Sequence, residues 1–171
     1  MRNRLLLGLT VAAATLALSA CDKPKDRHQQ TPPPGAGAAA KAPGLPPLPA
    51  WSKDMIGKAK AELFPGEPKP CLGNTDNVEQ KFADGVRIVG WGWDPAAKAP
   101  IARVILVDIT GLVAGAGETG LTRPDVPAAK PEVTSNTTGW AALTSRTTGP
   151  LDTFGILADG TSLCILGRLE F

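Results

Sequence analysis

The sequence predicts an all-β domain, a small antiparallel β-sandwich of about seven strands that begins near Cys71. Short segments rich in β-branched and aromatic residues recur through the second half of the chain, and such residues favour strands. Gly, Pro, Asn and Asp separate these segments, as turns require. Asp84-Gly85 and Asp159-Gly160 each stand between two strand-like segments, which predicts two tight hairpins whose glycines have positive φ.

The expected strands follow from this pattern in chain order. Residues 86–93 and 101–110 are the clearest, because both are dense in Val, Ile or Trp. Apolar residues lie on both faces of each, which predicts central strands covered on two sides. The complete set is residues 77–83, 86–93, 101–110, 112–119, 139–148, 151–158 and 162–169.

One short helix is expected before the sandwich, over residues 51–64. Ser52 can cap its first turn, and Trp51 can pack onto Ile56 in a hydrophobic staple. Phe64-Pro65-Gly66 ends it. We therefore expect residues 51–70 to form a helix and a connector, and residues 71–171 to form the sandwich.

Residues 21–50 have the composition of a disordered tether. Eight prolines and no aromatic side chain occur between residues 22 and 50, so this stretch cannot bury enough apolar surface to offset its ordering entropy. Proline-rich chains favour an extended helix of about 3.1 Å per residue, which would hold a domain away from a membrane. A ligand for a groove that recognises polyproline helices is the alternative.

Residues 1–20 predict a secretory signal peptide. Arg2 and Arg4 precede an apolar run, residues 5–18, that is too short to span a bilayer, and small residues follow it. The segment Leu18-Ser19-Ala20-Cys21 resembles the lipobox of bacterial lipoproteins. The resemblance implies cleavage before Cys21 and acylation of that residue by palmitate-type chains, so that membrane lipid is the first partner. An ordinary cleavage site beside a cysteine is the alternative.

Asp22 follows the lipobox. It is similar to the signal that retains enteric lipoproteins at the inner membrane, which favours the periplasmic face of that membrane in a Gram-negative envelope. The outer membrane is the alternative.

Cys71 and Cys164 remain once Cys21 is assigned to lipid. In an exported protein such a pair predicts a disulfide bond, and two independent buried thiols are the alternative. A bridge over more than ninety residues would stabilise the fold by roughly 4–5 kcal/mol in the chain-entropy model.

Four motifs of the domain occur together in one order. They are Gly90-Trp91-Gly92-Trp93-Asp94-Pro95, an apolar strand over residues 104–109, Arg123-Pro124-Asp125-Val126 and Gly139-Trp140. Together they resemble a β-sandwich module of bacterial envelope and polysaccharide-related proteins, over roughly residues 71–170. The chain departs from that module at Thr110-Gly111, where the module carries an acid before glycine. The resemblance implies a fold rather than an activity.

Catalysis, cofactors and metal binding are not expected. His28, the only histidine, lies in the tether, where nothing positions it for acid–base chemistry, and the paired cysteines leave no zinc ligands. The chain has 18 basic and 16 acidic side chains; the signal peptide contains two of the basic ones, so no nucleic-acid partner is indicated. An enzyme that pairs Asp94 with Asp108 or Asp125 is the least favoured reading.

Tryptophan is the best lead to a binding role. A solvent-facing Trp91, Trp93 or Trp140 could stack on a sugar ring or contact a protein partner, whereas in a sandwich such side chains usually fill the core. Arg123 and Asp125 could pin neighbouring loops or present a charge pair to a partner. We expect a non-catalytic, membrane-anchored envelope module for protein interaction or structural support. The alternative is a carbohydrate-binding module that uses exposed tryptophans.

Overall fold

The computed structural model describes residues 41–171 of the chain. The predictions for residues 1–40, which include the signal peptide, the lipidation of Cys21 and most of the tether, lie outside the described residues. Strands dominate the described part, which confirms the all-β class. Its elements are η1 (Ala50–Ser52), α1 (Lys60–Leu63), β1 (Leu72–Phe82), β2 (Gly85–Asp94), β3 (Ala99–Pro100), β4 (Arg103–Asp108), β5 (Val113–Leu121), α2 (Asp125–Ala129), β6 (Gly139–Thr144), β7 (Leu151–Ile156) and β8 (Leu163–Leu169).

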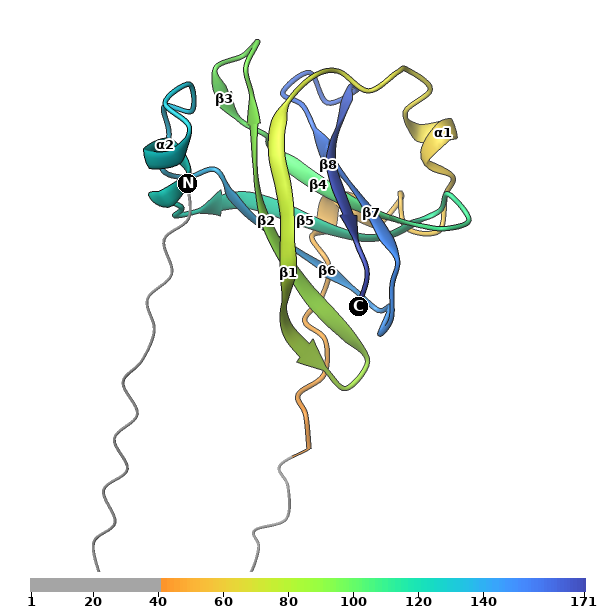
Figure 1. Cartoon of the computed structure of the whole chain (residues 1–171). Coiled ribbons are helices and arrows are strands. Elements are labelled where there is room, and N and C mark those ends of the chain that lie inside the picture. The colour runs from red at the N-terminus through yellow and green to blue at the C-terminus, as the bar shows by residue number, and fades with distance from the viewer. Residues whose placement is uncertain (1–40) are drawn as a thin grey trace, which may run out of the picture. The chain divides into compact units, whose positions relative to one another are not determined.

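All strands belong to one antiparallel sheet with the order β1-β2-β6-β5-β4-β7-β8, and β3 pairs with β2 beside this path. The sheet curls until its two edge strands, β1 and β8, lie against each other (Figure 1). The two layers of the predicted sandwich are therefore opposite parts of one curled sheet. Because every neighbour is antiparallel and seven strands lie on the path, β1 and β8 run in the same direction.

The seam between β1 and β8 is closed by individual contacts. The predicted disulfide between Cys71 and Cys164 is present, with 5.8 Å between the two Cα atoms. The backbone N–H of Lys69 donates to the Leu163 carbonyl over 2.7 Å, and the Thr75 hydroxyl donates to the Leu166 carbonyl over 3.3 Å. These bonds close the curled sheet.

Each of the seven predicted strands overlaps an observed one, and only the two-residue β3 was not predicted. The hairpin turns differ from expectation at one glycine. Gly160 has φ 71°, as predicted, but Gly85 does not adopt positive φ. A Cβ at Gly85 would collide with the Thr144 carbonyl and the Leu45 side chain. Space, rather than backbone conformation, therefore requires glycine at Gly85.

The core has three parts. The first fills the inside of the curl with side chains from facing strands, among them Ile88, Val104 and Leu166. The second lies outside β4, β5 and β7, where Phe64 and the residues around it cover Ile105 and Val107. The third lies outside β2 beneath the α2 segment. The prediction that β2 and β4 are covered on both sides is confirmed.

The predicted single helix over residues 51–64 is wrong. This segment contains η1, a series of turns and the four-residue α1. Its backbone groups bond to the sheet: the Gly57 N–H donates to the Val113 carbonyl over 2.8 Å, and the Lys60 N–H donates to the Gly111 carbonyl over 2.9 Å. Such bonds replace those of a continuous helix, because Gly57 turns the chain with φ 80°.

Ser52 and Trp51 consequently have other roles than those predicted. The Ser52 hydroxyl donates to the Pro49 carbonyl over 2.8 Å instead of accepting from a helix N–H. Trp51 packs against the outer cluster with Phe64, and the guanidinium of Arg103 lies 4.9 Å from the centre of the indole. None of the helices in the described residues is long and apolar enough to cross a bilayer.

Residues 41–50, expected as the end of the tether, lie against the sheet. The Pro43 carbonyl accepts from the Ala83 N–H over 3.0 Å, and the Leu45 N–H donates to Asp84 Oδ1 over 2.6 Å. Leu45 also lies over Gly85, where no side chain occupies the surface. The β1–β2 turn thus gives this segment hydrogen bonds that its composition does not reveal.

Candidate functional site

The three tryptophans considered for binding are core residues. Trp91, Trp93 and Trp140 are 9%, 2% and 0% exposed. Trp91 and Trp93 lie on the outer face of β2 and are covered by Val126 of α2 and Val133 of the loop that follows α2. The core placement that the sequence favoured is therefore observed and the solvent-facing alternative is contradicted, because the loop after β5 folds back over Trp91 and Trp93.

Trp140 fills the interior of the curled sheet. It belongs to the central cluster, and a Cβ at Gly90 would collide with its ring. Glycine at this position of β2 gives the indole its space. Without an accessible indole face, none of these three residues can stack on a sugar.

Arg123 and Asp125 pin the loop after β5 to the sheet. The guanidinium binds Asp125 through two nitrogens, over 2.9 and 2.8 Å, and its third nitrogen donates to Asp76 of β1 over 2.6 Å. The hydrogen bonds that Arg123 donates to Asp125 and then to Asp76 raise its pKa, and Arg123 lowers the pKa of Asp125. The structure thus favours the pinning role over a charge pair that faces a partner.

The three carboxylates considered as an enzymatic pair have separate partners. Asp125 binds Arg123. Asp94 accepts from the backbone of its own turn, at Ala96. Asp108 binds Arg146. The described residues also hold no group of three or more His, Cys, Asp or Glu side chains that could bind a metal ion.

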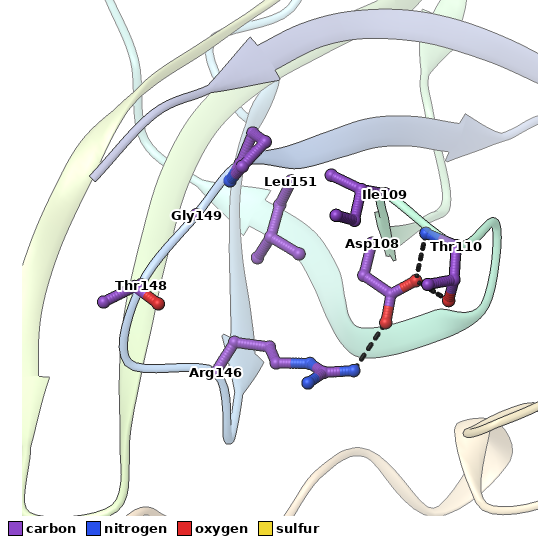
Figure 2. A pocket seen from close by; sticks show the side chains of 8 residues that line it. Asp108, Ile109, Thr110, Arg146, Thr148, Gly149 and Leu151 are labelled. Carbon is purple, nitrogen blue, oxygen red and sulfur yellow. Dashed lines mark hydrogen bonds and ion pairs between the residues drawn. The ribbon is translucent and has the colours of Figure 1, made fainter.

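A pocket of about 290 Å³ opens between the β4–β5 turn and the β6–β7 loop (Figure 2). We call it the Asp108 pocket. Its lining residues are Asp108, Ile109, Thr110, Arg146, Thr148, Gly149, Pro150 and Leu151. Leu151 and Asp108 are buried residues of the lining, whereas Thr110, Arg146 and Thr148 are exposed.

The carboxylate of Asp108 organises the turn at the end of β4. Its Oδ1 accepts from the Thr110 N–H over 2.9 Å, from the Thr110 hydroxyl over 2.6 Å and from the Leu112 N–H over 3.2 Å. This is the hydrogen-bonded turn that aspartate favours, and Gly111 completes it with φ 82°. The acid of this turn is therefore Asp108, which lies three residues before Gly111. The residue directly before Gly111 is Thr110.

Arg146 completes the coordination of Asp108. Its guanidinium donates to Oδ2, and the Thr144 hydroxyl accepts from the Arg146 backbone N–H over 3.1 Å while donating to the Ala114 carbonyl over 2.7 Å. Burial raises the pKa of Asp108, but the hydrogen bonds from Thr110 and Leu112 and the charge of Arg146 outweigh it, so the pKa is lowered. Asp108 is thus an ionised carboxylate with both oxygens engaged.

Sequence reasoning missed Arg146. It lies 38 residues after Asp108 in a loop of serine and threonine, and no local pattern signals that the two side chains meet. Only a prediction that the β4–β5 and β6–β7 connections share one end of the sheet could have suggested the pair.

The rim of the Asp108 pocket combines an aliphatic side chain with an arginine. Ile109 is 72% exposed, the highest value among the exposed large hydrophobic residues of the described chain. The Arg146 side chain is 54% exposed and retains guanidinium donors beyond the one that binds Asp108. Both oxygens of the Asp108 carboxylate already accept hydrogen bonds. The exposed surface therefore offers a partner the apolar side chain of Ile109 and the hydrogen-bond donors of Arg146.

No protein-family model, curated protein or solved structure matches this chain. The candidate site therefore stands on its own geometry.

Proposed function

We propose that this chain is a lipid-anchored lipoprotein of a bacterial envelope, and that its β-domain is a non-catalytic module that binds another protein at the Asp108 pocket. The disulfide carries this proposal. Cys71 and Cys164 are bonded to each other, so Cys21 is the only one of three cysteines left for acylation. It stands at the last position of the lipobox-like segment.

The surface at the Asp108 pocket favours a protein partner over a glycan. Sugar rings are bound by stacking on aromatic faces, and the indoles of Trp91, Trp93 and Trp140 are buried. An exposed aliphatic side chain such as Ile109 gains free energy when a partner removes it from water. Arginine, present here as Arg146, is enriched at protein interfaces.

A non-catalytic role is supported by the state of Asp108. A general base needs a free acceptor within reach of a substrate proton, and both oxygens of this carboxylate already accept hydrogen bonds. The Thr110 hydroxyl donates to Oδ1 of Asp108, but the other donors to this carboxylate lower its pKa, which makes it a weak base for activating a nucleophile.

Acyl labelling tests the anchor. Cells that express the chain and take up an alkynyl palmitate analogue should label the wild type and not Cys21→Ser. The double variant Cys71→Ser/Cys164→Ser is the matched control and should keep the label. We expect mass spectrometry to find a diacylated or triacylated N-terminal peptide that begins at Cys21. An unlabelled wild type, or a Cys21→Ser chain that stays with the membranes, would refute the anchor.

Density-gradient fractionation of the same cells tests which of the two membranes holds the protein. Asp22 predicts that the labelled protein sediments with the inner membrane, and Asp22→Ser should move it toward the outer membrane. Wild-type protein in the outer-membrane fraction would overturn the retention role of Asp22 and leave the lipid anchor in place.

Site-specific photo-crosslinking tests the binding surface. A benzophenone amino acid at Ile109 should form a discrete protein adduct in intact cells. The same group at Ile165, which is 61% exposed on β8, is a matched control and should not. Equal adducts at both positions, or none at Ile109, would remove the Asp108 pocket as the interface.

A further inference from the structure

A second pocket lies at the opening between the connector before β1, the β2–β3 turn and the β7–β8 turn. Its volume is about 380 Å³, and we call it the Asp94 pocket. Six of its nine lining residues are proline, alanine or leucine, and the others are two aspartates and a lysine: Lys69, Pro70, Asp94, Pro95, Ala96, Ala97, Leu157, Ala158 and Asp159. Among them, Leu157 is 5% exposed and part of the central core.

Asp94 places an incompletely satisfied carboxylate in this apolar pocket. The residue is only 6% exposed. Its Oδ1 accepts from the Ala96 N–H over 2.9 Å and from the Ala97 N–H over 3.1 Å. Its Oδ2 accepts no hydrogen bond from any residue of the described chain. Because Oδ2 is not fully buried, it is open to the pocket, where a cationic ligand can replace water with a charge-assisted hydrogen bond.

The charges around the pocket favour a cation. Lys69 Nζ lies 2.9 Å from Asp159 Oδ2, and Asp159 also accepts from the backbone and the hydroxyl of Ser162. Hydrogen bonds from Ser162 and then Lys69 hold the pKa of Asp159 far below its usual value. Lys69 is thus paired with Asp159 and is not the partner of Asp94. Two carboxylates and one ammonium leave the pocket with a net charge of about −1.

The residues that line the Asp94 pocket favour an organic ammonium group over a metal ion. Divalent metal ions need several oxygen ligands, and no group of three acidic, histidine or cysteine side chains occurs in the described residues. An ammonium on a short aliphatic chain suits the lining better, because its methylenes can cover Pro70, Ala97 and Leu157 while the charge reaches Asp94.

We propose that the Asp94 pocket is a binding site for an alkylammonium group, whose N–H donates to Asp94 Oδ2 while its methylene chain lies on the proline, alanine and leucine walls. The group belongs either to a lysine side chain of a protein or to a free aliphatic amine. This site is separate from the Asp108 pocket and does not depend on the function proposed there.

NMR titration of the full mature chain, made unlipidated with Cys21→Ser, tests the site. Pentylammonium chloride should shift the amide resonances of Ala96 and Ala97 in a saturable way. Pentanol, which has the same chain without the charge, should not. The amides of Thr110 and Gly111 at the Asp108 pocket serve as an internal control and should not respond.

Two variants should move the affinity in opposite directions. Asp94→Asn keeps an oxygen for the Ala96 and Ala97 N–H groups and removes the charge, so binding should weaken by about tenfold or more, as expected for loss of a charged hydrogen bond. Lys69→Gln removes a positive charge from the pocket lining and makes the pocket more negative, so binding of the cation should strengthen by about twofold to fivefold. Comparison of Nα-acetyl-lysine methylamide with pentylammonium separates the two sources: tighter binding of the lysine derivative assigns the site to a protein side chain, and tighter binding of the amine assigns it to a free amine.

Three results would overturn the proposal. They are the absence of a saturable shift at Ala96 and Ala97 in the unsubstituted pocket, an equal response to pentanol, and unchanged or weaker binding in Lys69→Gln. The first two use the wild-type pocket, so they decide the matter even when Asp94→Asn does not fold.

Discussion

Replacing Asp108 with alanine should destabilise the domain, because one carboxylate holds the β4–β5 turn and the β6–β7 loop together. The substitution removes the acceptor of three hydrogen bonds at Oδ1, from Thr110 and Leu112, and of one ion pair at Oδ2, from Arg146. The residue itself is 8% exposed.

The expected magnitude follows from these contacts. At about 1 kcal/mol for each intramolecular hydrogen bond, the three at Oδ1 contribute about 3 kcal/mol. The Arg146 side chain is 54% exposed, so solvent screening limits the ion pair to less than about 1 kcal/mol. Water in the adjacent Asp108 pocket can replace some of the hydrogen bonds that the donors of Thr110, Leu112 and Arg146 lose. We therefore expect Asp108→Ala to lower the free energy of unfolding by about 2–3 kcal/mol.

The loss should depend on pH in a defined direction. The pKa of Asp108 is lowered from its ordinary value of 3.8, so the unfolded chain binds this proton more readily than the folded one. The contribution of Asp108 is therefore fully present above the ordinary pKa and disappears as the pH falls through the lowered one. Wild type and Asp108→Ala should differ by a constant amount from neutral pH to about pH 4 and should converge below it.

Urea denaturation followed by the emission of the buried tryptophans measures this difference. Asp108→Asn is the matched control: it keeps an oxygen acceptor for the turn and loses the ion pair, so it should cost less than Asp108→Ala and remove the pH dependence. A cost below about 0.5 kcal/mol, or a difference between wild type and Asp108→Ala that stays constant below pH 4, would show that Asp108 does not hold the turn as argued.

Three further substitutions test the disulfide, the packing of Trp140 against Gly90 and the ion pairs of Arg123. Replacing Cys71 and Cys164 with serine should lower the free energy of unfolding by about 4–5 kcal/mol in the chain-entropy model, because the bond spans 93 residues; calorimetry under oxidising conditions measures it. Gly90→Ala should cost about 1–3 kcal/mol in urea denaturation, because a Cβ there collides with a buried ring and overpacking strains the core. Arg123→Ala should lower the melting temperature more than Arg168→Ala does, because the Arg123 side chain is 27% exposed and that of Arg168 is 51% exposed.

Each of these has a result that contradicts it. Equal stability of the oxidised wild type and the double serine variant would mean that the bridge does not restrict the unfolded chain. A neutral Gly90→Ala variant would mean that the strand can shift away from the indole. Equal losses for the two arginine variants would place Arg123 among ordinary surface ion pairs.

Much of the strand pattern could be predicted, because period-two alternation and Gly or Asp turns are local properties of the chain. Residues 86–93 and 101–110 show this most clearly, and they correspond to β2 and β4. The failed helix over residues 51–64 had the composition of a helix with a cap. Its backbone instead bonds to β5 and to the β4–β5 turn, a competition that the segment alone does not encode.

The site was less predictable than the strands. The sequence favoured core positions for the tryptophans and left binding as the alternative. Burial of Trp91 and Trp93 depends on Val126 and Val133, which follow them by more than thirty residues. The two pockets depend on pairs such as Asp108 with Arg146 and Asp159 with Lys69, which are 38 and 90 residues apart. Long-range ion pairs leave no local pattern in a single sequence.

The sequence by itself therefore determined the β class and the approximate positions of the seven main strands, and it favoured the Cys71–Cys164 bond over two free thiols, because periodicity, turn residues and cysteine count are properties of the chain before it folds. Only the tertiary structure decided that the sheet curls into one continuous layer, that the tryptophans are internal, and that Asp94 and Asp108 line two separate pockets. The physical reason is that burial and charge pairing depend on which distant segments meet, and the order of the strands in the sheet sets those meetings.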